Sequence, residues 1–206
     1  MANPRKIGVV LFDQVELLDF AGPVEVLSGA RVPAPGDTLQ PAFELLLLAE
    51  RPGPIATAQG VQVVATTALE ACPPLDVILI PGGWGTRAQV KNPVLLDWVR
   101  RHSASAELTT SVCTGALVLG GAGLLDGRRA TTHWESLDLL RRSFPRIDVV
   151  ADEHVVRDGQ VFTSAGVAAG IDLALHIVGH YLGEAAARTI ARHIEYPYPE
   201  SNARRV

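Results

Sequence analysis

Cys113 stands where a nucleophile could be displayed, in the segment Ser111-Val112-Cys113-Thr114-Gly115. A tight turn from a strand into a helix needs small neighbours, because its backbone is strained and the side chain must project from it. The same turn aims the first amides of the helix at the thiol, where they can stabilise negative charge and lower the thiol pKa. A small buried cysteine at a strand end is the alternative, and the local sequence favours neither.

A glycine loop, Pro81-Gly82-Gly83-Trp84, follows another apolar run. Glycine lets a backbone amide approach a ligand closely, so Gly83 could supply an oxyanion donor beside Gly82. Trp84 is a candidate pocket wall or a surface residue. The loop lacks the features of a phosphate loop or a dinucleotide fingerprint. Taken alone, it is better explained as a tight turn without chemistry.

Asp19 lies in an apolar stretch of leucine and phenylalanine. A carboxylate there should be buried with a partner or poised in a cleft. In a cleft its pKa would be raised, as acid–base catalysis near neutral pH requires. A structural acceptor for the loop around Gly22 is the alternative, and Glu16 and Glu25 compete for the same chemical role.

The histidines give weak support for a catalytic triad or a metal site. His133 precedes a predicted helix, where capping or packing is favoured over catalysis. His176 and His180 are one helical turn apart but have no carboxylate or cysteine beside them, so we expect no metal. The pair His193 and Glu195 resembles a His-x-Glu dyad, yet it ends a terminal helix and is not favoured.

Strands that alternate with helices must position these residues. The pattern predicts an α/β fold with a mostly parallel sheet covered on both faces. Ligands then bind at the carboxyl ends of the strands, where Cys113 and the glycine loop fall. The predicted strands are 6–12, 43–48, 75–80, 107–112 and 147–150, with a hairpin or extended arms over 55–66 and a hairpin over 154–163. The predicted helices are 15–30 (broken or restarted at Gly22-Pro23), 90–101, 116–125, 134–143, 167–182 and 185–194.

Composition narrows the possible partners. The chain has 206 residues, 48% of them hydrophobic, so one domain over 1–206 can bury a substantial core. A net charge of −4 without any Lys/Arg block disfavours nucleic acid and anionic membranes as partners. No stretch has the length of a membrane span. Only Cys72, predicted to be structural, accompanies Cys113, so we expect no disulfide and a cytoplasmic location.

Together these motifs resemble the ThiJ/PfpI superfamily, which has a class I glutamine amidotransferase-like fold, and within it the isonitrile hydratase branch. The resemblance runs nearly end to end. The amidase-like domains of AraC-type transcription regulators share most of the same stretches. The residues that carry it are 18–23, 73–78, Pro81-Gly82-Gly83, 111–115, 127–134 and 155–159.

The resemblance implies a flavodoxin-like three-layer sandwich with a nucleophile elbow, a homodimer, a small-molecule substrate and no cofactor. It implies Cys113 as nucleophile with Asp19 and Thr114 beside it. The thiolate would add to an isonitrile carbon, Asp19 would protonate that carbon, and hydrolysis of the thioimidate would release an N-substituted formamide. Thr114 would position water or the substrate nitrogen, amides near Gly83 and Thr114 would stabilise the tetrahedral stage, and the pocket would be largely apolar.

Three other functions stay open. A ligand-sensing domain could keep the fold and its cysteine without turnover, although the chain ends before the helix-turn-helix region of AraC-type regulators. A redox sensor would form a sulfinate at Cys113. A deglycase or glyoxalase is disfavoured, as is a peptidase, because such relatives carry a histidine where this chain has Thr114.

Overall fold

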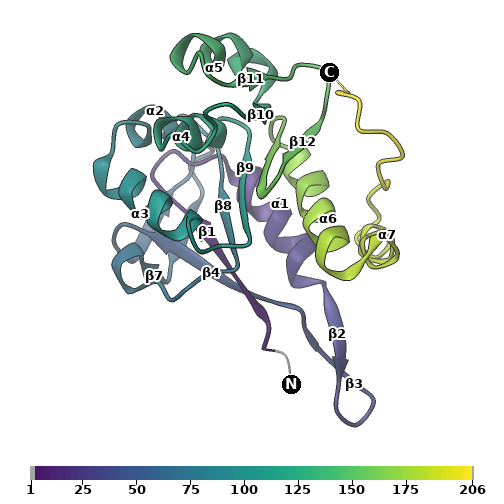
Figure 1. The fold of residues 1–206 in the computed structure, drawn as a ribbon. Coiled ribbons are helices and arrows are strands. Elements are labelled where there is room, and N and C mark those ends of the chain that lie inside the picture. Colours follow the sequence, from purple (N-terminus) through teal and green to yellow (C-terminus); the bar gives the residue numbers. More distant parts are fainter. Residues whose placement is uncertain (1–2, 206) are drawn as a thin grey trace.

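A computed structural model describes residues 3–205. Its centre is a seven-stranded sheet in the order β12-β13-β9-β8-β1-β4-β7, drawn in Figure 1. Every neighbouring pair is parallel except β12 with β13, which form an antiparallel hairpin. The predicted mostly parallel sheet is therefore confirmed. The strands are β1 (Arg5–Val10), β4 (Phe43–Ala49), β7 (Thr67–Ala68), β8 (Val77–Ile80), β9 (Leu108–Val112), β12 (Val155–Asp158) and β13 (Val161–Ser164).

Helices cover both faces of this sheet, as in the expected flavodoxin-like sandwich (Figure 1). One layer consists of α1 (Leu17–Ser28), α6 (Ala169–Leu182) and α7 (Glu184–His193), with α6 packed against the other two. The other layer is built around α4 (Gly115–Gly121), which contacts α2 (Thr86–Gln89), α3 (Pro93–Ser103) and α5 (Leu137–Ser143). Short elements complete the fold: β2 (Arg31–Ala34) with β3 (Thr38–Pro41), β5 (Gly53–Ala56) with β6 (Gln62–Ala65), β10 (Arg129–Ala130) with β11 (Asp148–Val149), η1 (Leu69–Ala71) and η2 (Trp134–Ser136).

Helix α1 runs through Gly22-Pro23, so the predicted break there is wrong. Proline removes one N–H from the helix, which would ordinarily weaken it. Close packing against α6 compensates: a Cβ on Gly22 would lie 2.9 Å from Ile171, and a Cβ on Gly170 would lie 3.2 Å from Pro23. The absence of side chains at Gly22 and Gly170 lets α1 and α6 approach each other closely. This packing fixes the position of α1 and therefore of Asp19 in its first turn.

The helix predicted over 90–101 begins later, at Pro93. The Asn92 side chain accepts hydrogen bonds from the amides of Val94 and Leu95, and proline occupies the first helical position. Both features are typical of a helix start, because they satisfy or dispense with otherwise unpaired amides. The preceding residues form the separate short helix α2.

Gly115 is the tightest contact between the sheet and α4, which gives a first prediction. A Cβ at this position would lie 2.1 Å from the Ile80 carbonyl oxygen. We expect Gly115→Ala to lower the free energy of unfolding by about 2 kcal/mol or more, because backbone must shift to accommodate the methyl group. Chemical denaturation measures this. Gly29→Ala is the control, since its Cβ would meet no atom closer than 3.4 Å; equal losses in both variants would contradict the prediction.

Candidate active site

Cys113 occupies the turn between β9 and α4 with φ of 55°, in the left-handed region that non-glycine residues rarely adopt. Its amide donates to the Ala165 carbonyl at 3.1 Å. Its carbonyl accepts from the Thr132 hydroxyl at 2.7 Å. Hydrogen bonds to both the amide and the carbonyl of Cys113 thus hold the strained turn in place, as sites with stored backbone strain require.

Asp19 reaches this turn from the first turn of α1 and is fully buried. Its Oδ2 accepts from the Gly82 amide at 2.8 Å, whereas its buried Oδ1 has no hydrogen-bond partner among residues 3–205. Burial raises the pKa of Asp19 to about 8, and the charge of Glu16 adds to the effect, while the Gly82 hydrogen bond opposes it. Asp19 therefore carries a proton at neutral pH.

The Cys113 thiol differs from the expectation of a lowered pKa. Burial raises the pKa of this thiol well above its usual range, and the charge of Asp19 raises it further. The amides of Thr114 and Val167 act in the opposite direction but are outweighed. Thiol and carboxyl group compete for one negative charge in a buried space, so the pair must be treated as coupled.

In the glycine loop after β8, the backbone amides donate to protein side chains and not to an oxyanion, contrary to expectation. The Gly82 amide is taken by Asp19, and the Gly83 amide donates to Thr114 Oγ1 at 3.0 Å. The Thr86 hydroxyl donates to the Gly83 carbonyl at 2.7 Å and locks the loop. Gly83 has φ of 118°, and a Cβ there would lie 2.4 Å from the Glu16 amide. The loop thus orients Asp19 and Thr114, and the Thr114 hydroxyl is engaged with it.

Val167 belongs to the site, although no sequence pattern pointed to it. Hydrogen bonding by its amide lowers the pKa of both Cys113 and Asp19. Its φ of 50° is strained for a β-branched residue. This conformation is also the reason that α6 begins at Ala169 and not at the predicted residue 167. The amides of Thr114 and Val167 are consequently the donors that face the thiol.

A cavity of about 160 Å³ opens over Cys113. Its mouth is charged, which contradicts the expectation of a largely apolar pocket. Trp84 forms part of the wall yet stays 68% exposed, with the Arg87 guanidinium 4.4 Å above its ring. Both roles considered for Trp84 therefore apply. The residues that line the cavity are Glu16, Gly83, Trp84, Arg87, Cys113, Thr114, His133, Glu135, Ser136 and Val167.

The remaining sequence candidates fall into two groups. His133 lines the cavity and its Nδ1 accepts from the Glu135 amide, so the predicted capping role is confirmed. The others lie away from the cavity: His193 is on α7, His176 and His180 are on α6, and half-buried Cys72 contacts its neighbour's carbonyl before β8. Within residues 3–205, His, Cys, Asp and Glu side chains form no cluster of three that could hold a metal ion.

The raised pKa of Asp19 gives a stability prediction. An unfolded Asp19 ionises near 3.8, whereas folded Asp19 keeps its proton up to about pH 8. The folded state therefore binds more protons across that interval, and the free energy of unfolding falls as pH rises, by about 1.4 kcal/mol per pH unit. Asp19→Asn removes this slope. We expect the variant to gain about 3 kcal/mol relative to wild type between pH 5 and 7.5.

Urea denaturation at several pH values measures the difference. Glu25→Gln, which removes an exposed carboxylate from the same helix, is the matched control, and its stability difference should not grow with pH. A difference between Asp19→Asn and wild type that stays constant from pH 5 to 7.5 would show that Asp19 ionises normally in the folded protein.

Residues 5–180 match the model of the DJ-1/PfpI family. The chain belongs to this family. This DJ-1/PfpI protein is 41% identical over 192 residues to the isonitrile hydratase of Pseudomonas putida, covering 93% of the present chain and 78% of the relative. It resembles the crystal structure of a ThiJ/PfpI family protein from Pseudomonas syringae with a TM-score of 0.84 and 31% identity, over 97% of this chain and 78% of that one.

A transcription regulator is also similar to this DJ-1/PfpI protein. The helix-turn-helix-type regulator CdhR of Pseudomonas aeruginosa is 36% identical over 131 residues, which is 64% of the present chain but only 38% of the regulator. The match to the family model, together with the hydratase and the ThiJ/PfpI structure, confirms the resemblance to the ThiJ/PfpI superfamily seen in the sequence. Helices in the described part of the chain are all too short or too polar to cross a bilayer.

Proposed function

We propose that this protein hydrates an isonitrile to an N-substituted formamide through a covalent intermediate on Cys113. The observation that carries the proposal is the pairing of the elbow thiol, which lines a cavity, with the buried, protonated carboxyl group of Asp19. Identity of 41% with an isonitrile hydratase supports the choice of reaction. The charged cavity mouth favours a small substrate whose reactive end alone enters the buried floor.

An isonitrile matches this pair because its terminal carbon both accepts a nucleophile and takes up a proton. Thiol and carboxylic acid must therefore face one atom. Asp19 supplies its proton to the carbon while sulfur forms the C–S bond, and the thiol proton returns to the carboxyl group. The product of this step is a thioimidate, R–N=CH–S–Cys113, with no net change in the protonation of the site.

Hydrolysis completes the cycle. Asp19 donates its proton to the thioimidate nitrogen and, now a carboxylate, accepts a proton from the water molecule whose oxygen adds to the thioimidate carbon. As the C–S bond breaks, the hydroxyl proton of the adduct passes to sulfur and restores the thiol. The sum is one isonitrile plus one water giving one formamide. The raised pKa of Asp19 suits both directions of transfer near neutral pH.

The remaining site residues orient these groups in the proposal. The amides of Thr114 and Val167 stabilise negative charge as the thiol reacts. Gly82 and Gly83 hold Asp19 and Thr114 in place through their own amides. Trp84 and Arg87 form the outer wall, against which the substituent on the substrate nitrogen would pack. Metal and cofactor have no part in this scheme.

The scheme predicts how hydration depends on pH. Because the acid form of Asp19 delivers the proton, kcat should fall as pH rises through the Asp19 pKa of about 8. Release of N-cyclohexylformamide from cyclohexyl isocyanide, followed by chromatography from pH 6 to 10, measures this and tests the proposed function. A rate that increases up to pH 10 would indicate a reaction limited by thiolate formation instead.

A ligand-sensing domain is the second candidate, favoured by the similarity to the regulator CdhR. Such a domain would bind a small electrophile in the same cavity without releasing product. Saturable binding of cyclohexyl isocyanide without formamide release distinguishes the two functions. Under either function we propose a cytoplasmic homodimer with a small-molecule ligand, and light scattering of the purified protein tests the oligomeric state.

A further inference from the structure

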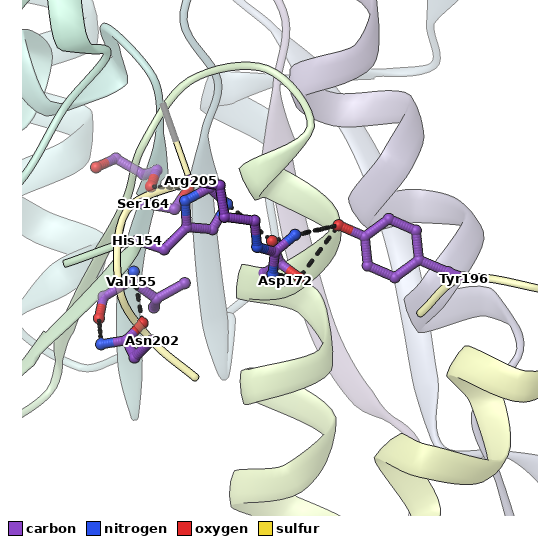
Figure 2. A network of polar contacts seen from close by, with 8 residues as sticks. His154, Val155, Ser164, Asp172, Tyr196, Asn202 and Arg205 are labelled. Carbon is purple, nitrogen blue, oxygen red and sulfur yellow. Dashed lines mark hydrogen bonds and ion pairs between the residues drawn. The ribbon is translucent and has the colours of Figure 1, made fainter. Parts of the chain in front are cut away.

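Residues 196–205 leave α7 and return along the outside of the molecule to the segment before β12 (the yellow trace in Figure 1). Asn202 binds the backbone of the edge strand there, beside an isolated β-bridge between Glu153 and Ala203. Its side chain accepts from the Val155 amide at 2.9 Å and donates to the Val155 carbonyl at 2.8 Å, while its own carbonyl accepts from the His154 amide at 2.7 Å (Figure 2). Three hydrogen bonds to two successive residues set the register of this tail.

A buried carboxylate anchors the tail a second time. Asp172, on the first turn of α6, is 1% exposed and lies 2.9 Å from His154 Nε2. Two tail side chains converge on it, with the Tyr196 hydroxyl at 3.2 Å and the Arg205 guanidinium at 3.1 Å (Figure 2). The tail is therefore docked at both ends on elements that also form the core.

Arg204 sits between these anchors and points to a different segment. Its amide donates to the Asp152 carbonyl at 2.7 Å, and its Nε donates to the Ala151 carbonyl at 2.6 Å. Its Nη2 donates to Thr131 Oγ1 at 2.5 Å and to the Thr132 carbonyl at 3.1 Å. Both threonines are fully buried, so the guanidinium fixes a segment that water does not reach.

The segment Thr131-Thr132 in turn restrains Cys113, the proposed nucleophile. The Thr132 hydroxyl donates to the Cys113 carbonyl at 2.7 Å, and the next residue, His133, lines the cavity. A continuous series of hydrogen bonds thus leads from the Arg204 guanidinium through Thr132 to the strained Cys113 peptide. Arg205, its neighbour in sequence, bonds to Asp172 and Tyr196 and takes no part in this series.

We propose that Arg204 is a positioning residue for Cys113, acting through Thr132. Fixing the Thr132 backbone fixes its hydroxyl, which holds the Cys113 carbonyl and keeps the thiol directed at Asp19. Without Arg204 the elbow relaxes and the thiol turns toward solvent. The inference concerns the geometry of Cys113, and it rests on the proposed function only for its hydration readout.

Arg204→Met and Arg205→Met form the matched test pair, because each removes one guanidinium from the same tail. We expect Arg204→Met to lower kcat for isonitrile hydration about tenfold or more with little change in KM, since small misplacements of reacting groups are costly. Iodoacetamide should alkylate Cys113 faster in this variant, with its pH midpoint shifted downward, because the relaxed thiol leaves the buried site. Peptide mass analysis separates this reaction from alkylation of Cys72.

General destabilisation of the tail would also expose the buried Cys113 to alkylation and slow hydration, so Arg205→Met is the control for it. Arg205→Met should lose thermal stability but keep both rates. Equal changes in the two variants, or an unchanged alkylation profile in a folded Arg204→Met, would overturn the proposal. Alkylation needs no isonitrile, so the proposal is tested even where no hydration is found.

Thr132 provides the second arm if Arg204→Met fails to fold. Thr132→Val removes the hydroxyl at constant shape and should reproduce both changes, whereas Thr132→Ser should restore wild-type rates. In the double variant that combines Arg204→Met with Thr132→Val, the effects on kcat should be less than additive, because both substitutions interrupt one series of hydrogen bonds. Full additivity would show that Arg204 does not act through Thr132.

Discussion

We expect Cys113→Ala to release formamide no faster than the reaction without protein, a loss of at least about 10⁴-fold in kcat. Cys113 is the sole thiol in the cavity, and the proposed reaction has no other nucleophile that could form the thioimidate. The variant should stay folded, because alanine fits the space and the hydrogen bonds of the Cys113 peptide come from its backbone. Formamide release and circular dichroism measure the two parts of this prediction.

Cys72→Ala is the matched control for the loss of a thiol. Cys72 lies before β8, away from the cavity, so formamide release should be unchanged in that variant. Hydration that survives in folded Cys113→Ala would contradict covalent catalysis and would leave Asp19 acting directly on water.

The second large effect is expected for Asp19→Asn, with a loss of about 10²- to 10⁴-fold in kcat. Asparagine keeps an oxygen for the Gly82 amide, so the geometry of the site is preserved. It has no proton that it can transfer to the isonitrile carbon, and it cannot accept one from water. Formamide release by this variant, measured from pH 6 to 10, should also lack the alkaline decline expected for wild type.

Glu25→Gln controls for the loss of a carboxyl group from α1, and its kcat should match that of wild type. Asp19→Asn is also expected to be more stable than wild type at neutral pH, because it removes a buried acid with a raised pKa. Loss of activity together with gain of stability marks a functional residue. An Asp19→Asn variant that hydrates at the wild-type rate would assign the proton transfer to another group.

The central strands could be predicted from the sequence because strands buried on both faces are continuous apolar runs. The apolar run 6–12 corresponds to β1 within two residues at each end. Strand β9 is an exception to the apolar pattern, because 107–112 is rich in β-prone threonine and not in apolar residues, yet its predicted bounds are correct within one residue. The hairpin of β2 and β3 escaped prediction, since its residues are mostly exposed and supply no apolar pattern. The continuity of α1 through Pro23 depends on α6, a contact that local propensity cannot show.

The site could be predicted only where side chains carry the signal. Small residues around Cys113 indicated the turn, and an acid in an apolar stretch indicated a buried Asp19. Val167 contributes through its backbone amide, and the residue type does not reveal where that amide lies in the fold. Arg87 and Glu135 look like ordinary surface charges on their own elements, so the charged mouth emerges only when the fold brings them together.

The proton balance also required the structure. Helix-end amides alone suggested a thiol with a lowered pKa, but the extent of burial and the position of Asp19 reverse that direction. Asp19 thus keeps its proton at neutral pH, which is the state that the proposed hydration requires.

Incubation of the purified protein with cyclohexyl isocyanide in ¹⁸O-labelled water tests covalent hydration by Cys113. We expect N-cyclohexylformamide that carries the label in its carbonyl oxygen, formed far faster than without protein, and we expect this product to be lost in Cys113→Ala. Formamide formation no faster than in the blank without protein would contradict it.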